Sequence, residues 1–239
     1  MPRLLMILAV GGGPADLGSA VDSDAIVTIR RTDAALAGFA SAHDWTLADL
    51  AVLAAGQGAE SEGFDAVCLG DFGDYGAGAL RSVLRVPVVA AGRSAMLHAL
   101  TLGSRFSVLV PAAGYTRAKK LVTEYGLAAQ CASVRAFPAA EGEQSGPAFA
   151  AALTAAKACV EEDGADVLCL ASTGDDLAAQ LAAELPVPVI DPARLTLKLA
   201  ESFLGLGLSQ SRRSWPEPQV RKPELVEALV AAARRVGAR

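Results

Sequence analysis

The sequence predicts an α/β fold of two pseudo-symmetric lobes, each a parallel sheet flanked by helices, with the active site in the cleft between the lobes. The first observation is an internal repeat, because residues 63–90 and residues 164–191 align without a gap. The second is that each copy holds two short apolar runs bounded by glycine or proline, which is typical of buried parallel strands. The third is the composition, since 52% hydrophobic residues in a chain of 239 suffice for a large core.

Each copy of the repeat is expected to form a strand, a turn, a helix of about a dozen residues and a second strand. Ligands bind beyond the carboxyl ends of parallel strands, so the residues after the first strand of each copy are site candidates. These residues are Asp71, Phe72 and Gly73 in the first copy and Ser172, Thr173 and Gly174 in the second. Two facing lobes would present Asp71 and Ser172 to one cleft.

The elements outside the repeat follow from apolar periodicity and from glycine and proline positions. We expect an opening strand at 4–10 and then a glycine-rich turn, in which Gly11 and Gly12 can approach a ligand through their backbone. Apolar spacing predicts a helix over 46–59 with Thr46 as its N-cap. The remaining elements expected are a helix from residue 92, strands at 105–110 and 130–136, and helices at 147–162, at 195–206 and after Pro223.

The repeat also predicts how the chain divides. Residues 1–92 are expected to form the first lobe, which residues 207–239 complete, and residues 93–206 the second lobe. Trp215 lies in the segment after the last repeat unit, and it is expected to pack on the partner lobe or on a second subunit.

Charge and hydropathy exclude several classes of partner. The net charge is −5 and no basic tract is present, so neither nucleic acid nor an anionic membrane is an expected partner. The apolar run at 4–10 is too short to span a bilayer and no signal-peptide cleavage pattern follows it. We therefore expect a cytoplasmic protein with a small-molecule substrate.

The sequence favours neither a metal nor an organic cofactor. The four cysteines have no Cys-x-x-Cys spacing and the two histidines, His43 and His98, are far apart. The glycine-rich turn at 11–14 completes neither a Walker nor a dinucleotide-binding motif. Cys68 and Cys169 lie inside apolar strand runs, where a cysteine behaves as a small hydrophobe, and they are expected to pack rather than react.

Polar residues at expected helix starts have a functional and a structural interpretation. Tyr115, Thr116 and Arg117 open a helix after the strand at 105–110. In the functional interpretation they hold a substrate carboxylate, and in the structural interpretation they form an ordinary helix N-terminus. Asp74 and Asp175 follow a glycine at the start of a helix in each lobe, and we interpret both as N-caps.

The motifs together resemble the Asp/Glu/hydantoin racemase superfamily, and the hydantoin racemase branch most of all. The resemblance covers about residues 40 to 222, and its motifs lie at 63–67, 72–76, 103–108, 125–128, 162–166, 189–192 and 206–213. It implies two α/β lobes, a cofactor-independent reaction, a homo-oligomer, and one cysteine from each lobe beside the substrate's α-carbon. One cysteine removes a proton and the other returns one on the opposite face, which inversion of a carbon acid requires.

The chain departs from that resemblance at both family cysteines. The first falls on Asp71 and the second on Ser172, and the Asn-Pro-Asn-Thr turn that usually follows the first strand is replaced by glycines. Asp71 is then the expected acid/base. Ser172 has no histidine nearby in sequence, so it is expected to hydrogen-bond an enolate-like intermediate or to orient the substrate.

Three functions are compatible with such a site. The first is an isomerase, a racemase or epimerase acting at a carbon acid next to a carboxylate or amide, with Asp71 as acid/base and Ser172 opposite. The second is a lyase on the same scaffold, either a decarboxylase or a retro-aldol enzyme that cleaves a carbon–carbon bond. The third is a protein that binds a small acid without turning it over, having lost both thiols.

Overall fold

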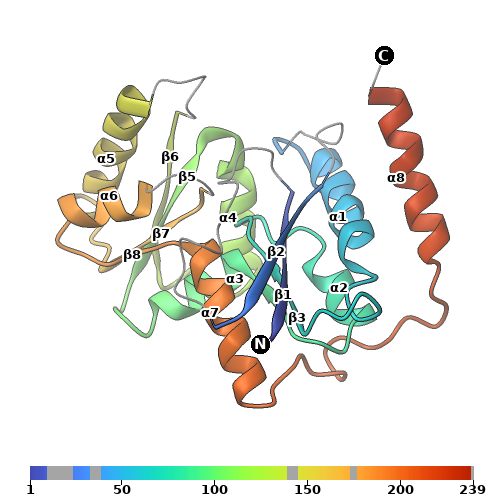
Figure 1. The fold of residues 1–239 in the computed structure, drawn as a ribbon. Coiled ribbons are helices and arrows are strands. Elements are labelled where there is room, and N and C mark those ends of the chain that lie inside the picture. The colour runs from blue at the N-terminus through green and yellow to red at the C-terminus, as the bar shows by residue number, and fades with distance from the viewer. Residues whose placement is uncertain (10–23, 33–38, 139–144, 173–176, 238–239) are drawn as a thin grey trace.

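The computed structural model describes residues 1–9, 24–32, 39–138, 145–172 and 177–237. In this part of the chain it contains two four-stranded sheets, with strand orders β2-β1-β3-β4 in sheet A and β6-β5-β7-β8 in sheet B. Every strand pairing within the two sheets is parallel. The predicted fold class, two parallel sheets flanked by helices, is confirmed (Figure 1).

The strands of the two sheets are short and their central members are buried. Sheet A consists of β1 (Arg3–Leu8), β2 (Ile26–Arg31), β3 (Ala66–Leu69) and β4 (Val88–Ala90). Sheet B consists of β5 (Phe106–Pro111), β6 (Cys131–Phe137), β7 (Val167–Leu170) and β8 (Val189–Ile190). The opening strand ends at Leu8, and the glycines predicted to follow it lie outside the described residues.

The two repeat copies form equivalent units, as predicted. β3, α2 (Ala77–Val83) and β4 make up the first, and β7, α6 (Leu177–Glu184) and β8 the second. The register is the same in both, since Cys68 pairs with Val89 and Cys169 pairs with Ile190. A slip of one residue would turn each side chain to the opposite face of the sheet, so this shared register places Asp71 and Ser172 equivalently.

A repeated aspartate fixes the start of the central strand in each sheet. Asp65 Oδ2 accepts a hydrogen bond from the backbone N–H of Arg3 at 2.7 Å, and Asp166 Oδ2 accepts one from Arg105 at 2.9 Å. Both carboxylates lie at the strand ends remote from the site candidates. This pair of identical residues in the repeat is therefore structural.

Helices cover the outer faces of both sheets and fill the space between them. In Figure 1, α5 and α6 lie beside sheet B, α1 and α8 lie beyond sheet A, and α3, α4 and α7 lie between the sheets. The bounds of the helices not yet given are α1 (Ala42–Gly56), α3 (Ala91–Ala99), α4 (Tyr115–Glu124), α5 (Ser145–Glu161), α7 (Pro192–Gly205) and α8 (Pro223–Gly237). None of the described helices is long and apolar enough to cross a membrane.

The start of α1 differs from its prediction. Its N-cap is Ser41, not Thr46: Asp44 N–H donates to Ser41 Oγ at 3.3 Å, and Ser41 N–H donates to the Asp44 carboxylate at 3.0 Å. These reciprocal bonds satisfy two backbone donors of the first turn, which is why the helix begins earlier. Thr46 lies inside the helix, where its hydroxyl donates to Ala42 O.

The helix that follows each repeat unit packs against the sheet of the other lobe. α3 follows β4, but Ala95 and Met96 belong to the apolar cluster of sheet B, with Val108 of β5. α7 follows β8, but Leu197 and Ala200 belong to the cluster of sheet A. The predicted boundary at residue 206 assigns α7 to the second lobe, whereas its packing places it with the first.

The last part of the chain returns to the first lobe. Gln210 Nε2 donates to Leu84 O at 2.8 Å, and α8 packs on α1 through Val230 and Ala51. The guanidinium of Arg81, a residue of α2, lies over the Trp215 ring at 5.3 Å from the ring centroid. Trp215 therefore packs within the first lobe, and its predicted place on the partner lobe is wrong because residues 207–237 fold back onto α1 and α2.

Candidate active site

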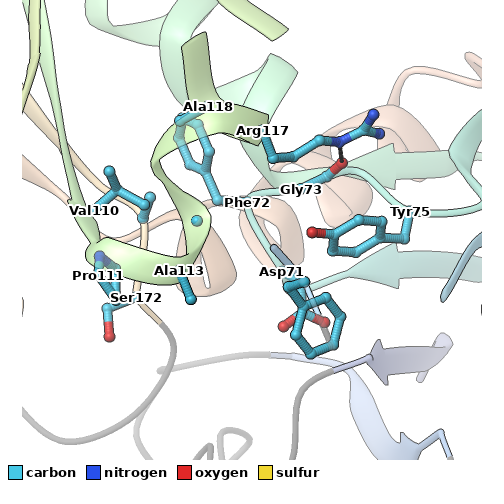
Figure 2. Close-up of a pocket in the computed structure, with 13 residues that line it drawn as sticks. Asp71, Phe72, Gly73, Tyr75, Val110, Pro111, Ala113, Arg117, Ala118 and Ser172 are labelled. Atoms are coloured by element: carbon cyan, nitrogen blue, oxygen red, sulfur yellow. Dashed lines mark hydrogen bonds between the residues drawn. The ribbon is translucent and has the colours of Figure 1, made fainter. Parts of the chain in front are cut away.

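A pocket of about 190 Å³ lies between the lobes, beyond the carboxyl ends of β3, β5 and β7. The loops after these strands and the start of α4 form its walls, and Figure 2 shows their side chains around it. The residues that line it are Phe39, Asp71, Phe72, Gly73, Tyr75, Val110, Pro111, Ala113, Gly114, Arg117, Ala118, Ala171 and Ser172. Most of this lining is apolar.

The structure brings Asp71 and Ser172 to this one pocket, from equivalent positions in the two lobes. Figure 2 shows them on different sides of it. Asp71 is 7% exposed, and its Oδ2 accepts a hydrogen bond from the backbone N–H of Ala9, the residue after β1. The carboxylate is therefore held between the ends of two neighbouring strands. Ser172 is half-buried.

The loop after β3 is anchored by Asp74, three residues after Asp71. The buried Asp74 carboxylate accepts hydrogen bonds from Gly92 N–H and Arg93 N–H at 2.7 and 2.8 Å, and from Tyr125 O–H at 2.7 Å. Burial raises the pKa of Asp74, and these three donors oppose that effect. The predicted N-cap role is corrected: Asp74 caps α3, while α2 begins after Gly76 without a side-chain cap. Asp175 lies outside the described residues.

Arg117 of α4 binds the same loop. Its Nε donates to Gly73 O at 2.8 Å, and its guanidinium lies 5.4 and 5.2 Å from the ring centroids of Trp45 and Tyr75. Together with Tyr125 at the end of the helix, Arg117 ties α4 to the loop that carries Asp71. Arg117 lines the pocket, and its role in substrate binding stays a prediction.

The other two residues predicted at this helix start lie elsewhere. α4 begins at Tyr115, after Gly114, and no side chain caps it. Thr116 is exposed and Tyr115 is half-buried, packed on the apolar cluster of sheet B, and neither lines the pocket. Of the remaining predicted contacts, Gly11, Gly12, Thr173 and Gly174 lie outside the described residues.

Phe72 joins the two lobes at the pocket. It follows Asp71 in the first lobe but packs in the apolar cluster of sheet B, with Met96 and Val108, and it is buried. The side chain therefore both lines the pocket and fixes the Asp71 loop against the second lobe. A buried aromatic ring contributes about 1.5–3 kcal/mol of transfer free energy, so this anchor is substantial.

Sequence reasoning missed Tyr75, Phe39 and the segment 110–114. The segment 110–114 comprises the last two residues of β5 and the turn after it. The predicted end of this strand was a sufficient signal, because it faces the same cleft as the end of β7. Tyr75 lies between Gly73 and Gly76 in the loop after β3. Phe39 precedes α1 and has no local signal; Trp45 Nε1 donates to its carbonyl at 2.6 Å.

The prediction that Cys68 and Cys169 pack inside the sheets is confirmed. Both are 0% exposed, and neither lines the pocket. Burial raises the pKa of Cys68 to about 12 and also raises that of Cys169, so neither thiol ionises near neutral pH. Among the described residues, no three His, Cys, Asp or Glu side chains are grouped so that they could hold a metal ion.

Replacing Cys68 or Cys169 by Ala should leave turnover nearly unchanged and cost about 1–2 kcal/mol of unfolding free energy, because packing is lost together with, for Cys68, a weak hydrogen bond from Sγ to Thr196 O at 3.5 Å. Urea denaturation and initial rates of the two variants measure both effects. Alkylating the native protein with iodoacetamide should not inactivate it. Rapid, stoichiometric inactivation at either residue, prevented by substrate, would contradict the assignment.

Comparisons with known proteins agree with the fold. The family model described as Asp/Glu/Hydantoin racemase matches residues 17–200. A hydantoin racemase from Pseudomonas sp. (strain NS671) is 34% identical over 176 residues, which are 71% of this chain and 70% of that protein. The matches to curated hydantoin racemases thus span about two thirds of the length of those relatives, 66% in one and 70% in another.

Solved structures lead to the same family. An allantoin racemase from Klebsiella pneumoniae superposes with a TM-score of 0.81 at 27% identity, covering 92% of this chain and 95% of that one. A variant of arylmalonate decarboxylase, at 16% identity and a TM-score of 0.64, covers 86% and 94% and shares the fold. The chain therefore belongs to the Asp/Glu/hydantoin racemase family, and its homologues are racemases, a class of isomerase.

Proposed function

We propose that the protein is a cofactor-independent racemase or epimerase that inverts a carbon acid next to a carboxylate or amide, with Asp71 as acid/base and Ser172 opposite. The observation that carries this proposal is the position of the Asp71 carboxylate. It lies in an apolar pocket between the lobes, held by the N–H of Ala9, at the place equivalent to Ser172. A base fixed beside the α-carbon is what proton abstraction needs.

In this mechanism Asp71 removes the α-proton, and negative charge develops on the adjacent carbonyl oxygen of the substrate. The first turn of α4 borders the pocket at Gly114 and Arg117, and the amino end of a helix favours such charge. Apolar walls from Phe72, Val110 and Ala118 restrict water, which strengthens these interactions. A second proton then reaches the α-carbon from the other face, delivered by a water molecule, and the proton held by Asp71 passes to the hydroxide that remains.

Ser172 acts on that other face. A serine hydroxyl is a weak base without an activating partner, so Ser172 serves as a hydrogen-bond donor to the intermediate or holds the water that returns the proton. The two faces are therefore chemically unequal, unlike those between two thiols. The enantiomer that points its α-proton at Asp71 is deprotonated faster than its mirror image.

The lining favours a substrate with an apolar substituent. Phe39, Phe72, Val110 and Ala118 surround the polar groups of the pocket, and its volume of about 190 Å³ suits a small ring with one side chain. Since the relatives are hydantoin and allantoin racemases, we propose hydantoins with an apolar group at C5 as substrates.

A decarboxylase is the second candidate function. The described lining of the pocket holds one carboxyl group and no thiol, and decarboxylation of a malonate needs only one group that delivers a proton. The fold shared with arylmalonate decarboxylase is compatible with this reaction.

Proton NMR in D₂O tests both functions with each enantiomer of 5-benzylhydantoin and with phenylmalonate. The proposal expects deuterium to enter C5 faster than it does without the enzyme. For one enantiomer, this exchange should be faster than inversion at C5. Chiral chromatography measures the inversion. Carbon dioxide from phenylmalonate without exchange in hydantoins would favour the lyase. Equal exchange from both enantiomers would contradict the unequal faces.

A further inference from the structure

Tyr75 places a polar group in the pocket that the mechanism above does not use. A Cβ at Gly73 would lie 2.3 Å from Tyr75 Cε2 and 2.8 Å from its hydroxyl oxygen, so the glycine makes room for this ring. The Phe39 ring lies 5.3 Å away, centroid to centroid, and the Arg117 guanidinium 5.2 Å from the Tyr75 centroid. At 5% exposure, the ring is held on several sides.

The hydroxyl of this rigid ring is directed into the pocket. Figure 2 shows the Tyr75 oxygen pointing toward the pocket interior, near Asp71, with which it shares the loop after β3. Within the part of the chain that the structure describes, no group forms a hydrogen bond with this hydroxyl. A phenol in an apolar pocket is normally paired, so its partner is expected to be a ligand.

The hydroxyl is a donor at neutral pH. Burial raises the pKa of Tyr75 above its ordinary value, and the charge of Asp71 acts in the same direction. The positive charge of Arg117 opposes this shift. Tyr75 therefore keeps its proton and offers it to a substrate oxygen, and it is not a base.

We propose that Tyr75 is a further catalytic residue, whose hydroxyl donates a hydrogen bond to the carbonyl oxygen next to the substrate's α-carbon. The assignment rests on the proposed function. As the α-proton moves to Asp71, the electron pair of the broken C–H bond forms a carbon–carbon double bond, and the π pair of the carbonyl moves onto that oxygen. Tyr75 keeps its proton and stabilises the charge, and the bond strengthens as the enolate forms.

Tyr75→Phe tests the proposal, because it keeps the ring against Gly73 and Arg117 and removes only the hydroxyl. In the NMR exchange assay kcat should fall about tenfold to a hundredfold with little change in KM, as when a donor to a developing oxyanion is lost. The comparison variant is Tyr115→Phe, the same change in a tyrosine that does not line the pocket. An unchanged kcat in Tyr75→Phe, or a larger loss in Tyr115→Phe, would overturn the proposal.

Binding of 5-benzylidenehydantoin, which is planar at C5 like the enolate and does not react, separates this proposal from the proposed function. Titration calorimetry should show binding about tenfold weaker in Tyr75→Phe. If the wild-type protein binds the probe but exchanges no proton, the proposed function fails, while weaker binding by the variant still supports the Tyr75 contact. Equal binding by both proteins overturns the contact, and absence of binding and exchange in the wild type overturns both.

Discussion

Asp71→Asn should lower the rate of α-proton exchange by about a hundredfold or more, because an amide has no basic oxygen to accept the proton. The fold should survive, since the Asn carbonyl oxygen can still accept the N–H of Ala9, as the Asp71 carboxylate does. Substrate affinity should change little. Exchange rates by NMR and affinity by titration calorimetry measure the two effects separately.

The matched control for this variant is Asp166→Asn. Asp166 is an exposed carboxylate that accepts the backbone N–H groups of Ser104 and Arg105 at the strand end remote from the pocket. The Asp166→Asn variant should exchange the α-proton at the same rate as the wild type. Ser172→Ala should lie between the two variants, losing at most about 3 kcal/mol of transition-state stabilisation. A near-normal rate in Asp71→Asn would exclude Asp71 as the base.

Gly92→Ala should have the second largest effect, although Gly92 does not line the pocket. A Cβ there would lie 2.2 Å from the carbonyl oxygen of Phe72 and 3.2 Å from Asp74 Oδ2. The backbone beside Asp71 must then move, which should cost about 1–3 kcal/mol of stability by overpacking. A displacement of about 1 Å at the base can lower the rate on the order of a hundredfold.

Gly205→Ala provides the control for that substitution. Gly205 ends α7, and a Cβ there would meet nothing within 4 Å. Alanine is favoured over glycine in helices by about 1 kcal/mol, so this variant should be as stable as the wild type or slightly more stable. Urea denaturation and exchange rates of both variants test the pair, and Gly92→Ala with wild-type activity would contradict the clash.

Local patterns predicted the strands well and helix boundaries less well. Short apolar runs between glycine and proline identified β3, β4, β7 and β8, because a parallel sheet buries both faces of its strands. The start of α1 was missed because Asp44 stands where the usual capping box has Glu or Gln. α7 covers sheet A because of packing between residues that are far apart in sequence, and no local sequence pattern predicts such packing.

The repeat alone indicated where the candidate site lies. Equivalent positions in two copies led to Asp71 and Ser172, since sheet register carries over from one copy to the other. The contacts of Asp74 and Arg117 could not be predicted, because each joins segments far apart in sequence through a single polar side chain. Tyr75 was missed for a similar reason, since its environment depends on Phe39 and Arg117.

The packing of α7 on sheet A has a consequence for synthesis of the chain. Leu4, Met6 and Cys68 share their apolar cluster with Leu197 and Ala200, so one face of the first sheet has no cover until the ribosome has passed residue 200. At ordinary rates of about 5–20 residues per second, the delay between the end of β4 at Ala90 and residue 200 lasts roughly 5–20 s. The lobe whose strands are made first is therefore completed last, and in the interval the nascent chain presents an apolar surface to chaperones.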